Sequence, residues 1–101
     1  MVYRIVFAPE ARNDLRSLYL YIAERSGGLR AMTFVERIEA HCRAFVDFPE
    51  RGTRRDDLAA GLRVTGFGRR VTIAFHIGTD IVTIDRILYG GRDLGALKDE
   101  S

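Results

Sequence analysis

Residues 69–89 read RRVTIAFHIGTDIVTIDRILY, and this stretch decides the fold. Two runs rich in β-branched and aromatic residues, 69–77 and 81–89, flank the short Gly-Thr-Asp link at 78–80. Such runs, separated by a short turn-forming link, are typical of a β-hairpin. Alternation along the first run predicts that its large apolar residues share one face of the sheet: Val71, Ile73, Phe75 and Ile77.

Outward from this hairpin, the sequence predicts two more strands and two helices. A strand over 62–67 precedes the turn at Gly68, and another spans 3–7 near the start of the chain. Apolar residues at spacings of three and four predict helices from Pro9 to about Ser26 and over 29–47. The expected order is therefore β-α-α-β-β-β.

Residues 1–101 make one domain of ordinary size. The two predicted helices are joined by Gly27-Gly28 and should run antiparallel. Neither helix can bury its apolar stripe alone, so both should pack on one face of the sheet. The fold class expected is α+β, with a helical hairpin packed on an antiparallel sheet.

Composition limits the kinds of function. The single cysteine, Cys42, cannot form an internal disulfide, and no Cys/His set with zinc-ligand spacing occurs. Cys42 lies on the apolar stripe of the second helix and is interpreted as a buried residue. Neither a signal peptide nor a membrane span is recognised, so a cytoplasmic protein without metal or cofactor is expected.

Positive charge is concentrated in the second half of the chain. Residues 1–50 hold seven Arg against seven acidic residues, whereas 51–92 hold eight Arg against four Asp. The segment 49–61 is expected to be an exposed, Arg-rich loop. In it, Asp56 and Asp57 are predicted to pair with Arg54 or Arg55.

Several segments together resemble the ParE family of toxins over nearly the whole chain. No segment is specific alone, but their order and spacing form a strong combination. The matching segments are 7–11 (FAPEA), 19–24, 48–52 (FPERG), 55–58, 61–63, 69–75 and 86–93 (RILYGGRD). One departure is Ala8, where the family usually has a capping Ser.

The resemblance implies a toxin of a type II toxin–antitoxin system. Such a toxin inhibits growth by binding DNA gyrase so that cleaved DNA persists, and a cognate ParD-like antitoxin neutralises it in a hetero-oligomer. The related RelE branch shares the fold and cuts messenger RNA in the ribosome. Fold alone cannot choose between these two activities.

The RelE-like alternative needs a base, an acid and cations for the transition state. Its candidate catalytic residues are Arg70, Arg86 and Tyr89. His76 is interpreted instead as a half-buried structural residue, and His41 as a residue at the edge of a helix stripe. The non-catalytic toxin is the preferred interpretation.

Binding residues are predicted as follows. Arg92 and Asp93 are expected to contact the target, and the antitoxin is expected to contact Leu20, Arg54, Arg63, Arg70 and Arg86. Two interpretations stay open for two of these. Arg86 is either paired with Asp85 or another neighbour, or exposed for a partner, and Leu20 is either an isolated exposed residue or part of a groove.

A third class, a small nucleic-acid-binding module, is permitted by the basic second half but lacks a recognition-helix or RNA-platform signature.

Overall fold

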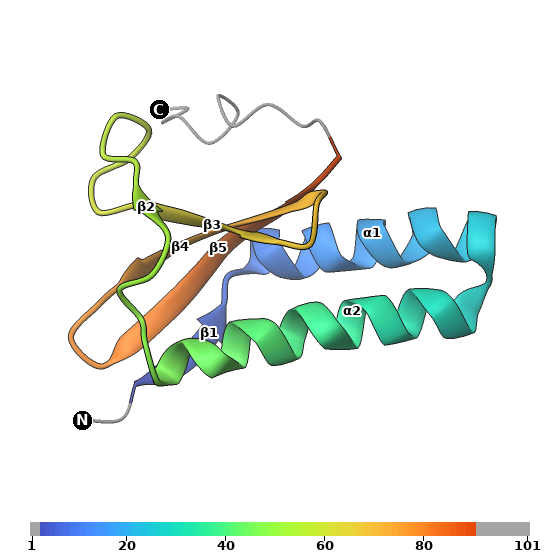
Figure 1. Ribbon diagram of the computed structural model, residues 1–101, viewed down its shortest axis with the longest axis horizontal. Coiled ribbons are helices and arrows are strands. Elements are labelled where there is room, and N and C mark those ends of the chain that lie inside the picture. Colours follow the sequence, from blue (N-terminus) through green and yellow to red (C-terminus); the bar gives the residue numbers. More distant parts are fainter. Residues whose placement is uncertain (1–2, 91–101) are drawn as a thin grey trace.

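The computed structural model describes residues 3–90, which form a pair of helices packed on a sheet (Figure 1). The elements in chain order are β1 (Arg4–Phe7), α1 (Pro9–Ser26), α2 (Gly28–Arg43), the 3-10 turn η1 (Ala44–Val46), β2 (Thr53–Arg54), β3 (Arg63–Phe67), β4 (Val71–Ile77) and β5 (Ile81–Tyr89). The α+β class and the packing of the helical hairpin on the sheet confirm the prediction.

The sheet has five strands in the order β1-β5-β4-β3-β2. The last four strands of the chain pair antiparallel, whereas β1 pairs parallel with β5, Arg4 lying opposite Ile81 and Phe7 opposite Ile84. The expected antiparallel sheet is thus corrected to a mixed one. Between β1 and β5 the chain passes through both helices, and so long a connection allows a parallel neighbour. The two-residue strand β2 lies in the segment that was expected to be a loop.

The helices begin and end close to the predicted positions. Pro9 is the first residue of α1, where its missing N–H is no loss, and Ala8 before it has no polar side chain that could cap the helix. Gly27, at φ 93°, ends α1 and lets α2 begin at once, and the two helices lie side by side (Figure 1). α2 ends at Arg43 and tightens into η1, before the predicted end at residue 47.

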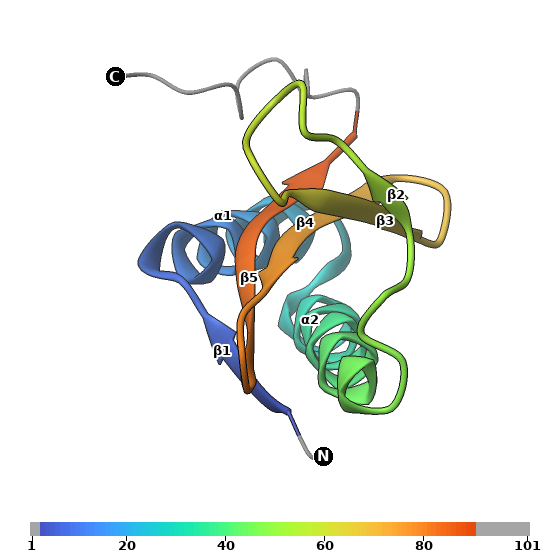
Figure 2. The same cartoon turned by 90° about the vertical axis from the view of Figure 1, so that its left-hand side faces the viewer.

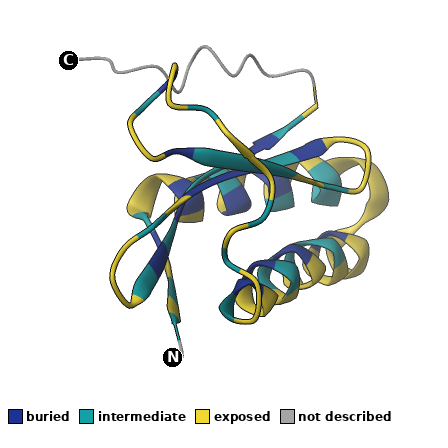
Figure 3. Ribbon diagram, turned by 60° about the vertical axis from the view of Figure 1, so that its left-hand side comes forward, coloured by how far each residue is buried: buried dark blue, intermediate teal, exposed yellow. Residues whose placement is uncertain are grey.

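The main core lies between the helices and the sheet. Figure 3 shows buried positions on the inner sides of the helices and exposed positions on their outer sides. Cys42 is buried in this core, as predicted. Its fully buried large side chains are Phe45, Phe75, Ile38, Ile73, Ile84 and Val82.

A second, smaller core lies on the other face of the sheet. Ala74 alternates with its buried neighbours Ile73 and Phe75 and therefore faces away from the helices. Leu58 and Leu62 pack on Ala74, so the Arg-rich segment folds back over the sheet (Figure 2). The expectation of a fully exposed loop is corrected to this extent.

Candidate functional site

Leu20, a predicted antitoxin contact, is 56% exposed on α1, although Leu18 and Leu15 of the same helix are buried. A lone exposed leucine is ordinary on a protein surface. Both interpretations of Leu20 therefore stay open.

Arg54 and its neighbours form the predicted ion pairs of the Arg-rich segment. Arg54 Nε lies 3.2 Å from Asp56 Oδ2. Arg55 donates hydrogen bonds to the two carboxylate oxygens of Asp57 through Nε and an NH2 group, at 3.0 and 2.9 Å. Asp56 also accepts the N–H of Gly61, and this bond, with Arg54, lowers the pKa of Asp56. The pairs are exposed, so they shape the segment more than they stabilise the fold.

Arg63 and Arg70, two further predicted contacts, have different surroundings. Arg63 is partly buried and donates through Nε to the backbone oxygen of Arg51 at 3.1 Å. It fastens the segment after α2 to β3. Arg70 is exposed in the β3–β4 turn, where its backbone oxygen accepts the N–H of Gly90.

Arg86 pairs with Asp14 of α1. Its Nε and an NH2 group donate to the two oxygens of Asp14 at 2.8 and 3.1 Å, and the backbone N–H of Ile87 donates to the same carboxylate at 2.8 Å. The Asp14 side chain is only 9% exposed. Arg86 thus has a neighbour as its partner, and the neighbour is Asp14 rather than Asp85.

A β-bulge explains why the apolar pattern of β5 is interrupted at Arg86. Ile84 lies opposite Phe75 and Arg86 lies opposite Ala74, so Asp85 is an extra residue with no counterpart on β4. The extra residue shifts the phase of the alternation. Arg86 therefore belongs to the sheet face of Ala74, while Ile87 returns to the helix side.

His76 and Asp85 meet across this bulge. His76 Nδ1 lies 2.8 Å from Asp85 Oδ2 on the face without helices. The His76 side chain is 47% exposed, so about half of it is buried, as expected. Burial raises the pKa of Asp85, and the bond with His76 opposes part of that rise.

Of the residues proposed for RNA cleavage, Arg70 and Tyr89 are neighbours in the sheet, because Val71 pairs with Tyr89 and the Arg70 backbone oxygen accepts the N–H of Gly90. Tyr89 faces the helices, where its ring lies 5.6 Å from that of Tyr21 and 6.3 Å from that of Phe34. Arg86 leaves the strand on the face of Ala74, but its guanidinium is bound by Asp14 of α1. The third candidate, Arg70, lies in the exposed turn.

A row of rings fills the seam between α2 and β3. His41 lies 5.1 Å from Phe67 and 5.6 Å from Phe45, measured between ring centroids. Burial, and then the nearby charge of Arg51, lowers the pKa of His41. The guanidinium of Arg51 lies 4.6 Å from the Phe45 ring centroid, and that of Arg37 lies 5.7 Å from the Phe67 centroid. Sequence reasoning missed this seam, since its members are far apart along the chain.

Chemistry at the remaining candidates is restricted. Burial raises the pKa of Cys42 to about 12, which leaves the thiol protonated and unreactive. Within residues 3–90, no cluster of three or more His, Cys, Asp or Glu is placed to hold a metal ion, and no helix is long and apolar enough to cross a membrane. The predicted target contacts Arg92 and Asp93 lie outside the described residues.

Comparison with known proteins now adds to this geometry. Residues 5–94 match the family model of the ParE toxin of the type II toxin–antitoxin system parDE. The fold resembles a chain of the chromosomal ParDE system from P. aeruginosa, with a TM-score of 0.77 at 19% identity over 88% of this chain and 97% of that one. It also resembles a chain of the RelBE2 toxin–antitoxin complex from Mycobacterium tuberculosis, with a TM-score of 0.62 at 19% identity over 88% and 99% of the two chains. Among curated proteins, none matches by sequence.

Proposed function

The chain belongs to the ParE toxin family of type II toxin–antitoxin systems, and from this premise we propose that it inhibits growth by binding DNA gyrase in the cytoplasm. A cognate ParD-like antitoxin would neutralise it in a hetero-oligomer. Two structurally similar chains come from a ParDE system and from a RelBE2 complex, which supports an antitoxin partner.

The observation that favours a binding function is that Tyr89 and Arg86, two of the three candidate catalytic residues, are engaged in contacts within the chain. Metal-independent RNA cleavage needs an acid or base and a cation around one phosphodiester. Tyr89 is packed against Tyr21 and Phe34, and the charge of Arg86 is offset by Asp14 of α1. These residues serve the fold in their present positions.

The proposal is tested by pulse labelling of DNA and protein synthesis just after induction of the chain without antitoxin. An early fall in DNA synthesis, followed by accumulation of cleaved DNA when purified toxin is added to gyrase, is expected. The matched control is the toxin with bound antitoxin, which should leave gyrase unaffected. An early fall in protein synthesis, with DNA synthesis spared, would instead assign the chain to the RelE-like ribonucleases, with Arg70, Arg86 and Tyr89 as the residues to substitute.

We also propose that the antitoxin contacts the exposed arginines of the predicted set. Arg63 and Arg86 make hydrogen bonds within the chain, so their substitution would lower the stability of the fold as well as any affinity for the antitoxin. The preferred variant is Arg54→Ala with Arg70→Ala, because both side chains are exposed and the exposed Arg54–Asp56 ion pair should contribute little to stability. Weaker antitoxin binding with a reduced salt dependence is expected; unchanged affinity and salt dependence would remove both arginines from the interface.

A further inference from the structure

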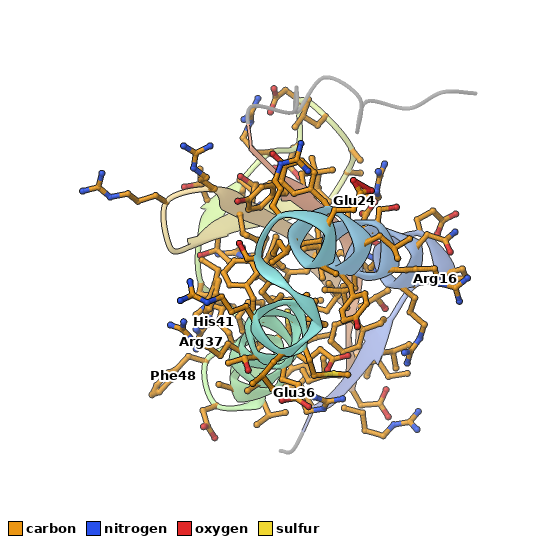
Figure 4. All side chains as sticks on the ribbon, turned by 90° about the vertical axis from the view of Figure 1, so that its right-hand side faces the viewer. Arg16, Glu24, Glu36, Arg37, His41 and Phe48 are labelled. Carbon is orange, nitrogen blue, oxygen red and sulfur yellow. The ribbon has the colours of Figure 1, made fainter. Side chains whose placement is uncertain are left out.

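One flank of α2 carries an exposed aromatic ring and arginines that form no ion pair with a carboxylate of residues 3–90. Phe48 is 73% exposed directly after the helical segment. Figure 4 shows Arg37, His41 and Phe48 projecting to the same flank of α2, while Arg16 lies on the other side of the molecule. Arg51 donates a hydrogen bond to the backbone oxygen of Phe48, and the Phe67 ring lies near His41 and Arg37. These five residues are here named the basic–aromatic strip.

The strip rests on a fixed scaffold. Arg51 Nε donates to the backbone oxygen of Phe48 at 2.9 Å, and Arg63 Nε donates to the backbone oxygen of Arg51 at 3.1 Å. Gly52 lies so close to β3 that a Cβ there would overlap the carbonyl oxygen of Val64. Phe48 and Arg51 are therefore held in position by several contacts to their neighbours.

The cations of the strip are available to an anion. Among residues 3–90, no carboxylate forms an ion pair with Arg37 or Arg51. Asp47 and Glu50 are exposed in the same segment but pair with neither. Each guanidinium lies near a ring, that of Arg37 on an exposed residue and that of Arg51 on a partly exposed one. The positive field at this site also reaches His41, whose pKa the charge of Arg51 helps to lower.

The rings decide between the anions that would fit. Arginine binds phosphates and carboxylates alike, so charge alone would also admit an acidic peptide. An exposed aromatic ring beside such cations suits a nucleobase, since every base has a flat π-face. The bases of a duplex already stack on one another, so the ligand should be unpaired.

We propose that the basic–aromatic strip binds single-stranded nucleic acid, with phosphates at Arg37 and Arg51 and a base stacked on Phe48. The strip extends along β3, which spans about 13 Å from Arg63 to Phe67, towards the exposed Arg69 and Arg70 of the following turn. This contact is additional to gyrase binding and would let the toxin touch unpaired strands held by its target.

The test is fluorescence anisotropy of a labelled (dT)12 oligonucleotide titrated with the full-length chain. Phe48→Ala should weaken binding about 5- to 150-fold, the loss of one stacked base, without changing the salt dependence. Arg37→Ala should lower the slope of log affinity against log salt by about 0.7, the value for one phosphate contact on a single strand. Arg16→Ala is the matched control and should change neither quantity. Because Phe48, Arg37 and Arg16 are exposed, these variants should fold normally.

Three outcomes would overturn the proposal: no binding of (dT)12, equal binding by Phe48→Ala, or equally good competition by a glutamate-rich peptide of the same charge. The last result would assign the strip to an acidic protein partner. Gyrase inhibition is measured separately on the same preparations. Gyrase inhibition without oligonucleotide binding would reject nucleic-acid binding by the strip and leave the gyrase proposal intact. Oligonucleotide binding without gyrase inhibition would reject the gyrase proposal and leave nucleic-acid binding intact.

Discussion

At the scale of single residues, the carboxylate of Asp14 takes the place of a missing strand neighbour. β1 pairs with β5 only as far as Ile84, so beyond that point none of the strands within residues 3–90 lies beside this edge of β5. The N–H of Ile87 on this edge donates to Asp14, which also binds the guanidinium of Arg86. One side chain of α1 thus satisfies a backbone donor and an arginine of β5 at once.

Replacement of Asp14 by alanine should therefore destabilise the fold. Hydrogen bonds to charged groups contribute about 1.5–3 kcal/mol each, and a loss of at least this size in the free energy of unfolding is expected. Asp14→Asn should lose less, because its amide oxygen can still accept the Ile87 N–H. Urea denaturation measures both values. Equal losses for the two variants would show that the charge, rather than the bond to Ile87, matters.

At the scale of elements, the segment after α2 depends on Gly52. Gly52 and Gly61 have the same φ of 76°, but a Cβ at Gly52 would strike Val64, whereas a Cβ at Gly61 meets nothing within 4 Å. Gly61→Ala should therefore cost only the backbone strain, about 1–2 kcal/mol. Gly52→Ala should cost about 1–3 kcal/mol more, since β3 or the segment must shift.

Thermal or urea unfolding of these two variants, measured side by side, checks the prediction. The comparison is matched because the backbone angle is shared and only the space around the Cβ differs. If Gly61→Ala were as destabilising as Gly52→Ala, close packing of the segment on β3 would not be what fixes it.

The free energy of unfolding should depend on pH through Asp85, the extra residue of the bulge in the β4–β5 pair. Its pKa is raised above 3.8 by burial, so the folded chain binds this proton more tightly than the unfolded chain does. Its contribution to stability is then fully present below the ordinary aspartate pKa and is lost as pH rises through the folded pKa. As pH rises from below the ordinary aspartate pKa, about 3.9, through the raised pKa of folded Asp85, wild type should lose stability relative to Asp85→Asn.

Carboxyl NMR titration gives a direct check of this reasoning. His76 opposes the rise in the pKa of Asp85, so His76→Gln should raise that pKa further. A lower pKa of Asp85 in the His76→Gln variant would contradict the assigned role of His76.

Local patterns in the sequence were sufficient for most elements but not for their junctions. Alternation and helical spacing act within a few residues, and they predicted both helices, the β3–β4–β5 meander and the pairing of Arg54 and Arg55 with Asp56 and Asp57. Folding alone brings together the segments that form the parallel pairing of β1, the bulge at Asp85 and the Asp14–Arg86 pair. Asp14 and Arg86, for example, are 72 positions apart. Asp14 could be interpreted from the sequence only as a charge near a helix start.

At the scale of the whole molecule, stability and toxicity should be separable. The buried core residues of the described chain all lie between Phe7 and Leu88. The predicted target contacts, Arg92 and Asp93, follow that core. Deletion of residues 92–101 should therefore leave the thermal unfolding midpoint and antitoxin binding nearly unchanged while it abolishes growth inhibition.

Growth after induction, antitoxin co-purification and thermal unfolding measure the three consequences together. The full-length variant Arg92→Ala with Asp93→Ala keeps the chain length constant and should behave like the deletion, whereas Lys98→Ala serves as the control for loss of a charge near the chain end. If the double variant stayed toxic, Arg92 and Asp93 would not be the target contact. If the double variant folded but no longer bound the antitoxin, this region would belong to the antitoxin interface. The three measurements thus distinguish target contact from antitoxin contact.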